Sequence, residues 1–180
     1  EHIQEVQDMA TRSRIGIINK GEVVADTVYC HWDGGRYVAQ ILKLYYTDVN
    51  KIKELISGGD LSSISKFIGE KHDFEKRNEH EDWCTYYKRD RGEDGVDPQW
   101  SSPSKFWGDS GEEYNYLYKV ETGKWYYRCY DSNRWKLLTD KVCEITKEDK
   151  EQAEKEIVEH NKKNQHKDVD KMLDDFLAKF

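Results

Sequence analysis

The chain has 180 residues, of which 36% are hydrophobic and 36% are charged, and its formal net charge is −7. A chain of this length supports one domain with its own core. Six Trp and twelve Tyr supply the apolar area that a disordered chain of similar charge lacks. The acidic balance argues against direct binding of nucleic acids, because phosphate contacts need a basic face. No apolar run approaches the roughly 20 residues that span a bilayer, so we expect a soluble, cytoplasmic protein.

The regular pattern begins at Met9, and we interpret residues 1–8 as a leader or a cloning remnant. Residues 14–18 and 23–32 are predicted to be two strands of a hairpin around the Lys20-Gly21 turn, because glycine suits a tight connection. Asp33-Gly34-Gly35 then ends the second strand.

Three helices are predicted after this hairpin. Apolar residues at helical spacing indicate an amphipathic helix over 36–46. Thr47 or Asp48 is expected to cap a second helix that ends at Gly58-Gly59. Asp60 is expected to cap a third, short helix that ends at Gly69.

Residues 70–110 are charged and irregular, yet they contain six aromatic residues between Trp83 and Trp107. Aromatic residues at that density pack, so we predict an ordered insertion around a short strand at 83–89. Three further strands, 113–120, 124–130 and 134–138, are predicted to form a meander, because their connections are short and turn-prone.

The C-terminal residues 146–180 are predicted to be a helical extension of a single domain that spans 9–145. Thr146 and Asp149 resemble a capping box that opens a helix to about His160. A last helix places apolar residues on a single stripe, which contains Val169, Met172, Leu173, Phe176, Leu177 and Phe180. Such a stripe is usually core, and otherwise it docks in a partner's groove through Met172, Phe176 and Phe180.

These elements predict an α+β fold with an antiparallel sheet of about five strands and helices on one face. Short turns force sequential strands to pair antiparallel, and no predicted helix joins two strands as a parallel crossover. The four cysteines, Cys30, Cys84, Cys129 and Cys143, are far apart and include no Cys-x-x-Cys pair. Reduced thiols in a cytosol are therefore expected, and no metal or other cofactor is predicted.

The first candidate site lies at the mouth of the predicted hairpin. Arg12 and Arg14 are expected to lie near His31 and Asp33, beside a glycine-rich entry to a helix. Guanidinium groups and backbone N–H donors at a helix start can hold an anion. The alternative is structural, with Asp33 as a helix cap that pairs with an arginine.

The second candidate site is the charged turn at residues 87–95, which contains Arg89 and Arg91 among acidic residues and glycines. Arginine recognises phosphate or carboxylate bidentately, so this turn is predicted to fold over the first site. The alternative is a surface loop whose charges pair with one another. A metal site built from His72, His80, Asp82 and Cys84 is disfavoured by its loose spacing.

Four segments, residues 9–17, 29–34, 60–63 and 89–93, together resemble a family of small uncharacterised proteins from bacteriophages and other mobile elements. The motifs are Thr-Arg-Ser-x-Ile-Gly-Ile, Tyr-Cys-His-Trp-Asp-Gly, Asp-Leu-Ser-Ser and Arg-Asp-Arg-Gly-Glu. The resemblance extends from about Met9 to Leu138. Relatives commonly continue Trp-Asp-Gly-Tyr-Pro, where this chain has Gly35-Arg36. The resemblance implies a genomic context and no particular chemistry.

We therefore expect a phage or mobile-element accessory protein that acts by binding a host or defence component, by sequestering either a protein or a nucleotide. One alternative is an enzyme for a nucleotide or phosphorylated substrate, with His31 as acid or base and the arginines as anion clamps. Against it, the sequence has no P-loop and no nucleophile with a positioned base. The other alternative is a structural or assembly protein that uses its C-terminal helix.

Overall fold

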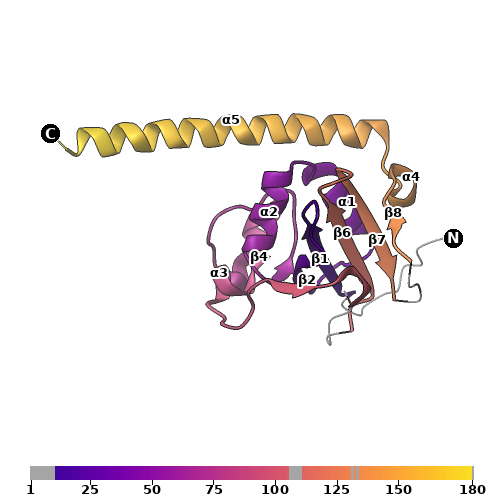
Figure 1. Ribbon diagram of the computed structural model, residues 1–180. Helices are drawn as coiled ribbons and strands as arrows, with labels where there is room; N and C mark the ends of the chain where they lie inside the picture. The colour runs from indigo at the N-terminus through magenta and orange to yellow at the C-terminus, as the bar shows by residue number, and fades with distance from the viewer. Residues whose placement is uncertain (1–10, 106–110, 131, 133, 180) are drawn as a thin grey trace. The chain divides into compact units, whose positions relative to one another are not determined.

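The computed structural model of the chain describes residues 11–105, 111–130, 132 and 134–179. The chain divides into two compact units, one up to Glu144 and one from Ile145 onwards (Figure 1). The predicted leader, residues 1–8, lies outside the described residues.

The first unit is built on a mixed sheet, which has eight strands within the described residues. The strand order is β4-β3-β2-β1-β6-β7-β8, and β5 also pairs with β2. The strands are β1 (Ser13–Ile18), β2 (Ala25–Cys30), β3 (Leu61–Ser63), β4 (Thr85–Tyr86), β5 (Gln99–Ser101), β6 (Tyr114–Lys119), β7 (Lys124–Cys129) and β8 (Lys136–Leu137).

The prediction of an antiparallel sheet of about five strands is wrong, because the sheet is mixed. Both expected sets of antiparallel strands are nevertheless present. β1 and β2 form the hairpin, and β6, β7 and β8 form the meander. The two groups join because β1 and β6 pair in parallel, and β3 adds to β2 in parallel. The chain between β2 and β3 is the parallel crossover that the sequence reading excluded, and it contains two helices.

The helices and 3₁₀ turns of the first unit are α1 (Arg36–Tyr45), α2 (Val49–Ser57), η1 (Phe74–His80), α3 (Tyr87–Arg91), η2 (Pro103–Lys105) and α4 (Asp140–Cys143). The predicted helices over 36–46 and after Asp48 are confirmed as α1 and α2. The Asp48 carboxylate accepts hydrogen bonds from the backbone N–H groups of Asn50 and Lys51 at 2.9 and 3.1 Å.

The predicted third helix, at residues 60–69, is instead β3 followed by irregular chain. The Asp60 carboxylate does not cap a helix but accepts a hydrogen bond from the backbone N–H of Tyr29 at 2.8 Å. This bond ties the start of β3 to β2, so a tertiary contact overrides the local helical pattern. The predicted strand at 83–89 is also shorter than expected, because α3 begins at Tyr87.

Large aromatic side chains join the sheet to α1 and the loop before it. The Tyr116 hydroxyl on β6 donates to the Gly34 and Gly35 carbonyl groups at 2.7 and 2.9 Å. The indole N–H of Trp125 on β7 donates to the Tyr46 carbonyl at 2.8 Å, where α1 ends. These bonds satisfy the polar ends of otherwise apolar buried rings.

The second unit contains α5 (Lys147–Leu177), a single helix of 31 residues. The capping box is confirmed, because Thr146 and Asp149 exchange side-chain to backbone hydrogen bonds. The predicted end near His160 is wrong, since no Gly or Pro interrupts the helix. Met172 and Phe176 are 72% and 57% exposed, and Phe180 lies outside the described residues. None of the described helices is long and apolar enough to cross a membrane.

We predict that Trp125→Ala lowers the free energy of unfolding by about 3–5 kcal/mol, because it removes a 4% exposed ring that packs edge-on against Tyr118. Urea titration measures the loss. Trp100, which is 81% exposed, provides the matched control, and Trp100→Ala should change stability by less than about 0.5 kcal/mol. Equal losses for the two variants would contradict the placement of Trp125 in the core.

Candidate functional site

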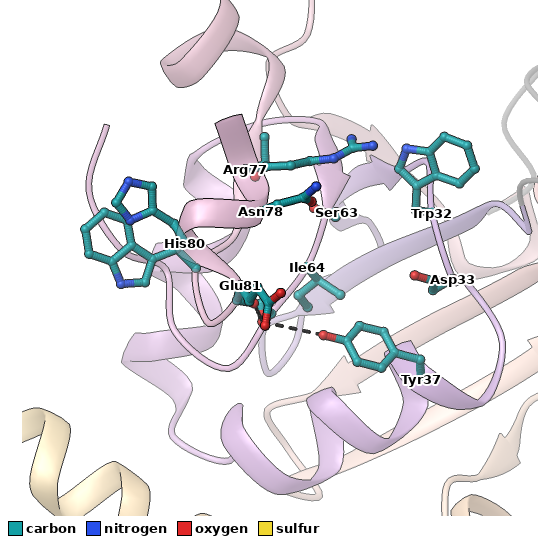
Figure 2. A pocket seen from close by; sticks show the side chains of 12 residues that line it. Trp32, Asp33, Tyr37, Ser63, Ile64, Arg77, Asn78, His80 and Glu81 are labelled. Atoms are coloured by element: carbon teal, nitrogen blue, oxygen red, sulfur yellow. Dashed lines mark hydrogen bonds between the residues drawn. The ribbon is translucent and has the colours of Figure 1, made fainter. Parts of the chain in front are cut away.

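A pocket of about 370 Å³ lies where three segments of the first unit meet (Figure 2). The first segment follows β2 and enters α1, the second follows the start of β3, and the third runs from η1 to β4. The pocket is large enough for a small-molecule ligand. Its lining mixes aromatic rings with charged and hydroxyl side chains.

Parallel pairing of β2 and β3 brings the first two segments together. Cys30 lies opposite Leu61 in the register, and beyond it the backbone N–H groups of His31 and Trp32 donate to the carbonyl groups of Leu61 and Ser62, both at 3.0 Å. Both strands therefore end at the same edge of the sheet. The carboxyl ends of adjacent parallel strands are a common place for a ligand site.

The turn after Trp32 leaves the Asp33 carboxylate exposed at the pocket. Asp33 has a left-handed backbone with φ of 57°. The next residue, Gly34, donates its N–H to the Thr11 carbonyl at 2.7 Å, and a Cβ there would lie 2.7–2.8 Å from backbone atoms of Thr11 and Arg12. Only glycine fits this contact. α1 begins after Gly35 without a side-chain cap, so Asp33 is not the helix cap that the structural alternative assigned to it.

His31 sits beside the pocket, and its imidazole has a lowered pKa. Burial and the charges of Arg12 and Arg77 lower the pKa of its imidazole. Its Nδ1 lies 2.8 Å from the Tyr29 hydroxyl, and burial raises the pKa of that hydroxyl to about 12. The ring stands edge-on to Trp32 with the two centroids 4.7 Å apart. His31 therefore supports Trp32 and does not itself line the pocket.

The opposite wall comes from η1 and the chain that follows it. Arg77 donates from Nη1 to the Ser62 hydroxyl at 3.0 Å, and its guanidinium lies 5.8 Å from the centre of the Trp32 ring. Among the described residues no carboxylate pairs with Arg77. His80 and Trp83 stack with their ring centroids 4.4 Å apart and an interplanar angle of 6°. Both residues are part of the pocket lining.

Of the six residues predicted to bind a ligand, Asp33 alone lines this pocket. Arg14 lies in the interior, where it pairs with Glu112 at 2.8 Å and donates to the Thr27 hydroxyl at 3.2 Å. Arg12 is exposed, and its backbone N–H donates to the Glu113 carboxylate at 2.6 Å. The two arginines lie in different environments because Arg14 is within β1, whereas Arg12 precedes the strand.

Arg89 forms a structural clamp with Asp90. Its Nε and Nη2 donate to the two Asp90 carboxylate oxygens at 2.8 and 3.0 Å. The same guanidinium donates to the Ile68, Gly69 and Cys84 carbonyl groups at 2.9, 3.2 and 2.7 Å. Asp90 also accepts from the backbone N–H groups of Tyr86 and His72. This Arg89–Asp90 clamp joins the two ends of the segment that carries Arg77.

Arg91 lies on the exposed side of α3, away from the pocket lining. Its Nε is 3.7 Å from the Glu93 carboxylate, and its guanidinium lies 5.1 Å from the Phe74 ring centre. The structure therefore does not bring the 89–93 turn and the hairpin mouth together at the pocket. The sequence analysis did not identify Arg77, Tyr37 and Glu81 as pocket residues. For Arg77, the sequence offered one signal, an arginine within a charged stretch that is rich in aromatic residues.

Thr85, His72 and Asp90 are arranged like a nucleophile, a base and an acid near the pocket, but His72 and Asp90 also form other hydrogen bonds that hold the fold. The Thr85 hydroxyl lies 3.1 Å from His72 Nε2, and His72 Nδ1 lies 3.7 Å from Asp90. However, His72 Nδ1 is only 2.9 Å from the Glu70 carbonyl, and Asp90 already accepts from Arg89. Thr85 is 1% exposed. The geometry is that of a buried histidine with its hydrogen bonds satisfied.

The cysteines near this region are poor nucleophiles. Burial raises the pKa of Cys84 to about 11 and that of Cys30 to about 12, so both remain thiols at neutral pH. The four cysteines form no disulfide. Within the described ranges, no three His, Cys, Asp or Glu side chains are grouped to hold a metal ion.

No protein-family model matches the chain, and no curated protein or solved structure matches it either.

We predict that Asp90→Asn lowers the free energy of unfolding by about 3 kcal/mol, because it leaves the Arg89 guanidinium without its carboxylate. Burial alone would raise the pKa of Asp90, but hydrogen bonds from Arg89 and from the Tyr86 and His72 backbone lower it below its usual value. The stabilisation is therefore complete above the unfolded pKa of about 3.9 and is lost as the pH falls below it.

Thermal and urea unfolding between pH 3 and pH 7 measure both effects. Asp94→Asn is the matched control, because Asp94 is exposed in the turn just after α3, and it should change stability by less than about 0.5 kcal/mol. If Asp90→Asn unfolds like the wild type at pH 7, the clamp does not hold this segment together.

Proposed function

We propose that this protein is a phage or mobile-element accessory protein that acts by binding, and that it sequesters a small ligand of its host in the pocket. The observation that carries the proposal is the exposure of Trp32, Asp33 and Tyr37 in a preformed hollow. Aromatic rings and a carboxylate that remain exposed in a hollow are typical of binding sites, because a ligand can cover them.

The location of the pocket supports the same proposal. Two of the segments that carry the resemblance to mobile-element proteins, residues 29–34 and 60–63, meet there. A third, residues 89–93, contains the clamp that holds the opposite wall in place. The fourth, residues 9–17, contacts the turn at Gly34. The motifs thus converge on building one pocket, even though few of their side chains line it.

A second candidate function is binding of a partner protein through α5, and the exposure of Met172 and Phe176 favours it. An amphipathic helix with such anchors docks its apolar face in a groove. Substitutions in the pocket should not affect this partner binding. The substitutions Met172→Ser and Phe176→Ser would abolish it, and their effect is measured by co-purification of the partner.

Native mass spectrometry of the chain purified from bacterial cells tests the pocket. We expect the wild type to carry a non-covalent small molecule, and Trp32→Ala to have lost it, because the substitution removes a wall of the pocket. Trp100→Ala is the matched control and should retain the molecule, since Trp100 is exposed on β5, outside the pocket lining. Identical unliganded masses for all three proteins would contradict sequestration of a host small molecule.

A further inference from the structure

The charged side chains of the pocket are separated by sign. In Figure 2, Arg77 and Asn78 lie along one side of the hollow, and Asp33, Tyr37 and Glu81 lie along the other. A ligand that fills the space would therefore meet a cation at one end and two carboxylates at the other. Neither a simple anion nor a simple cation suits both ends.

The cationic end has capacity for an oxyanion. Arg77 is half-buried, and its one hydrogen bond to protein uses Nη1, with Ser62. Its Nε and Nη2 donors have no acceptor within the described residues. A guanidinium presents such donors as a planar fork that matches phosphate or carboxylate oxygens. The Asn78 amide adds a further polar group at this end.

A ligand must present N–H donors to the acidic end of the pocket. Asp33 and Glu81 are both exposed, and among the described residues neither side chain forms an ion pair or a hydrogen bond. Ionised carboxylates are acceptors only. A ligand group placed here must therefore donate, and a second anionic group would be repelled.

The body of the ligand lies against rings. Trp32 and Tyr37 are 38% and 42% exposed, and His80 and Trp83 also belong to the lining. Planar heterocycles stack on such surfaces. The pocket volume of about 370 Å³ is at the lower end of the range for small-molecule sites, which fits one heterocycle with one charged substituent.

We propose that the pocket binds a nucleoside monophosphate whose base carries N–H donors on its edge, with guanine as the best fit. The phosphate is held by Arg77, and the base stacks beside Trp32 and Tyr37 with its edge toward Asp33 and Glu81. Guanine suits this end because its adjacent ring N–H and amino group together match one carboxylate. Uracil offers a single N–H. The inference rests on the proposed function and names the ligand class for the same pocket.

Isothermal titration calorimetry of the full chain with GMP, UMP, guanosine and inorganic phosphate tests the assignment. GMP should bind with the highest affinity, guanosine and UMP more weakly, and phosphate alone without measurable heat. Arg77→Gln should weaken GMP about tenfold and leave guanosine unchanged, because one charge-assisted contact is lost. Asp33→Asn and Glu81→Gln should reduce the preference for GMP over UMP. Asn tolerates the left-handed backbone of residue 33.

Two matched controls accompany these variants. Arg91→Gln removes an exposed arginine outside the pocket lining, and Glu79→Gln removes an exposed carboxylate of η1 that also lies outside it. Both should bind GMP like the wild type. Thermal unfolding of every variant shows whether a loss of binding reflects a loss of fold.

The inference is overturned if GMP produces no heat or if Arg77→Gln binds GMP as the wild type does. It is also overturned if Arg91→Gln, and not Arg77→Gln, loses GMP binding. Binding of a zwitterionic amino acid such as phenylalanine, with loss in the same variants, also overturns the nucleotide assignment. A bound molecule of another class in native mass spectrometry, absent from Trp32→Ala, leaves the proposed function standing while this inference fails. If native mass spectrometry finds no bound molecule and GMP produces no heat, both the proposed function and this inference are contradicted.

Discussion

The Arg89–Asp90 clamp determines where one wall of the pocket stands. Residues 68–90 contain only short elements, η1, β4 and most of α3. Arg89 ties Ile68, Gly69 and Cys84 together, and Asp90 adds the backbone of His72 and Tyr86. The loop between these anchor points carries Arg77, His80, Glu81 and Trp83. A loop of this length closes at an entropic cost, which the multiply bonded ion pair offsets. The clamp therefore acts on ligand binding through position, without contacting the ligand.

The opposite wall depends on the parallel pairing of β2 with β3. That pairing brings residues 31–33 beside residues 61–63 and lets α1 start at the pocket with Tyr37 on its first turn. The tight contact of Gly34 with Thr11 and Arg12 then fixes the turn that presents Trp32 and Asp33. Each wall is thus held by contacts outside the pocket, and the lining side chains remain available to a ligand. Such preorganisation reduces the entropic cost of binding.

Local patterns in the sequence predicted the hairpin, α1, α2, the meander and the capping box, because each depends on residues close together in the chain. They failed at residues 60–69, where the Asp60 carboxylate bonds to Tyr29 on β2 instead of capping a helix. The parallel pairing of β1 with β6 joins residues about a hundred positions apart, and no local signal encodes it.

The sequence located the candidate site only in part. It identified Asp33, but it also assigned Arg14 and Arg89 to ligand binding because of their charge pattern. In the structure these two arginines form ion pairs with Glu112 and Asp90. Charge alone does not distinguish a buried structural arginine from a half-buried arginine that lacks an acidic partner, such as Arg77.

The claim on which the account rests is that a ligand occupies the pocket between Trp32 and Trp83. Indole N–H resonances of the tryptophans, followed by ¹H–¹⁵N NMR during a titration with GMP, report on that location directly. We expect large, saturable shifts for the Trp32 and Trp83 resonances. The resonances of Trp125, buried against Tyr118, and of Trp100, exposed on β5, should not shift. Shifts confined to Trp100, or no shift for Trp32 and Trp83 at saturating GMP, would contradict it.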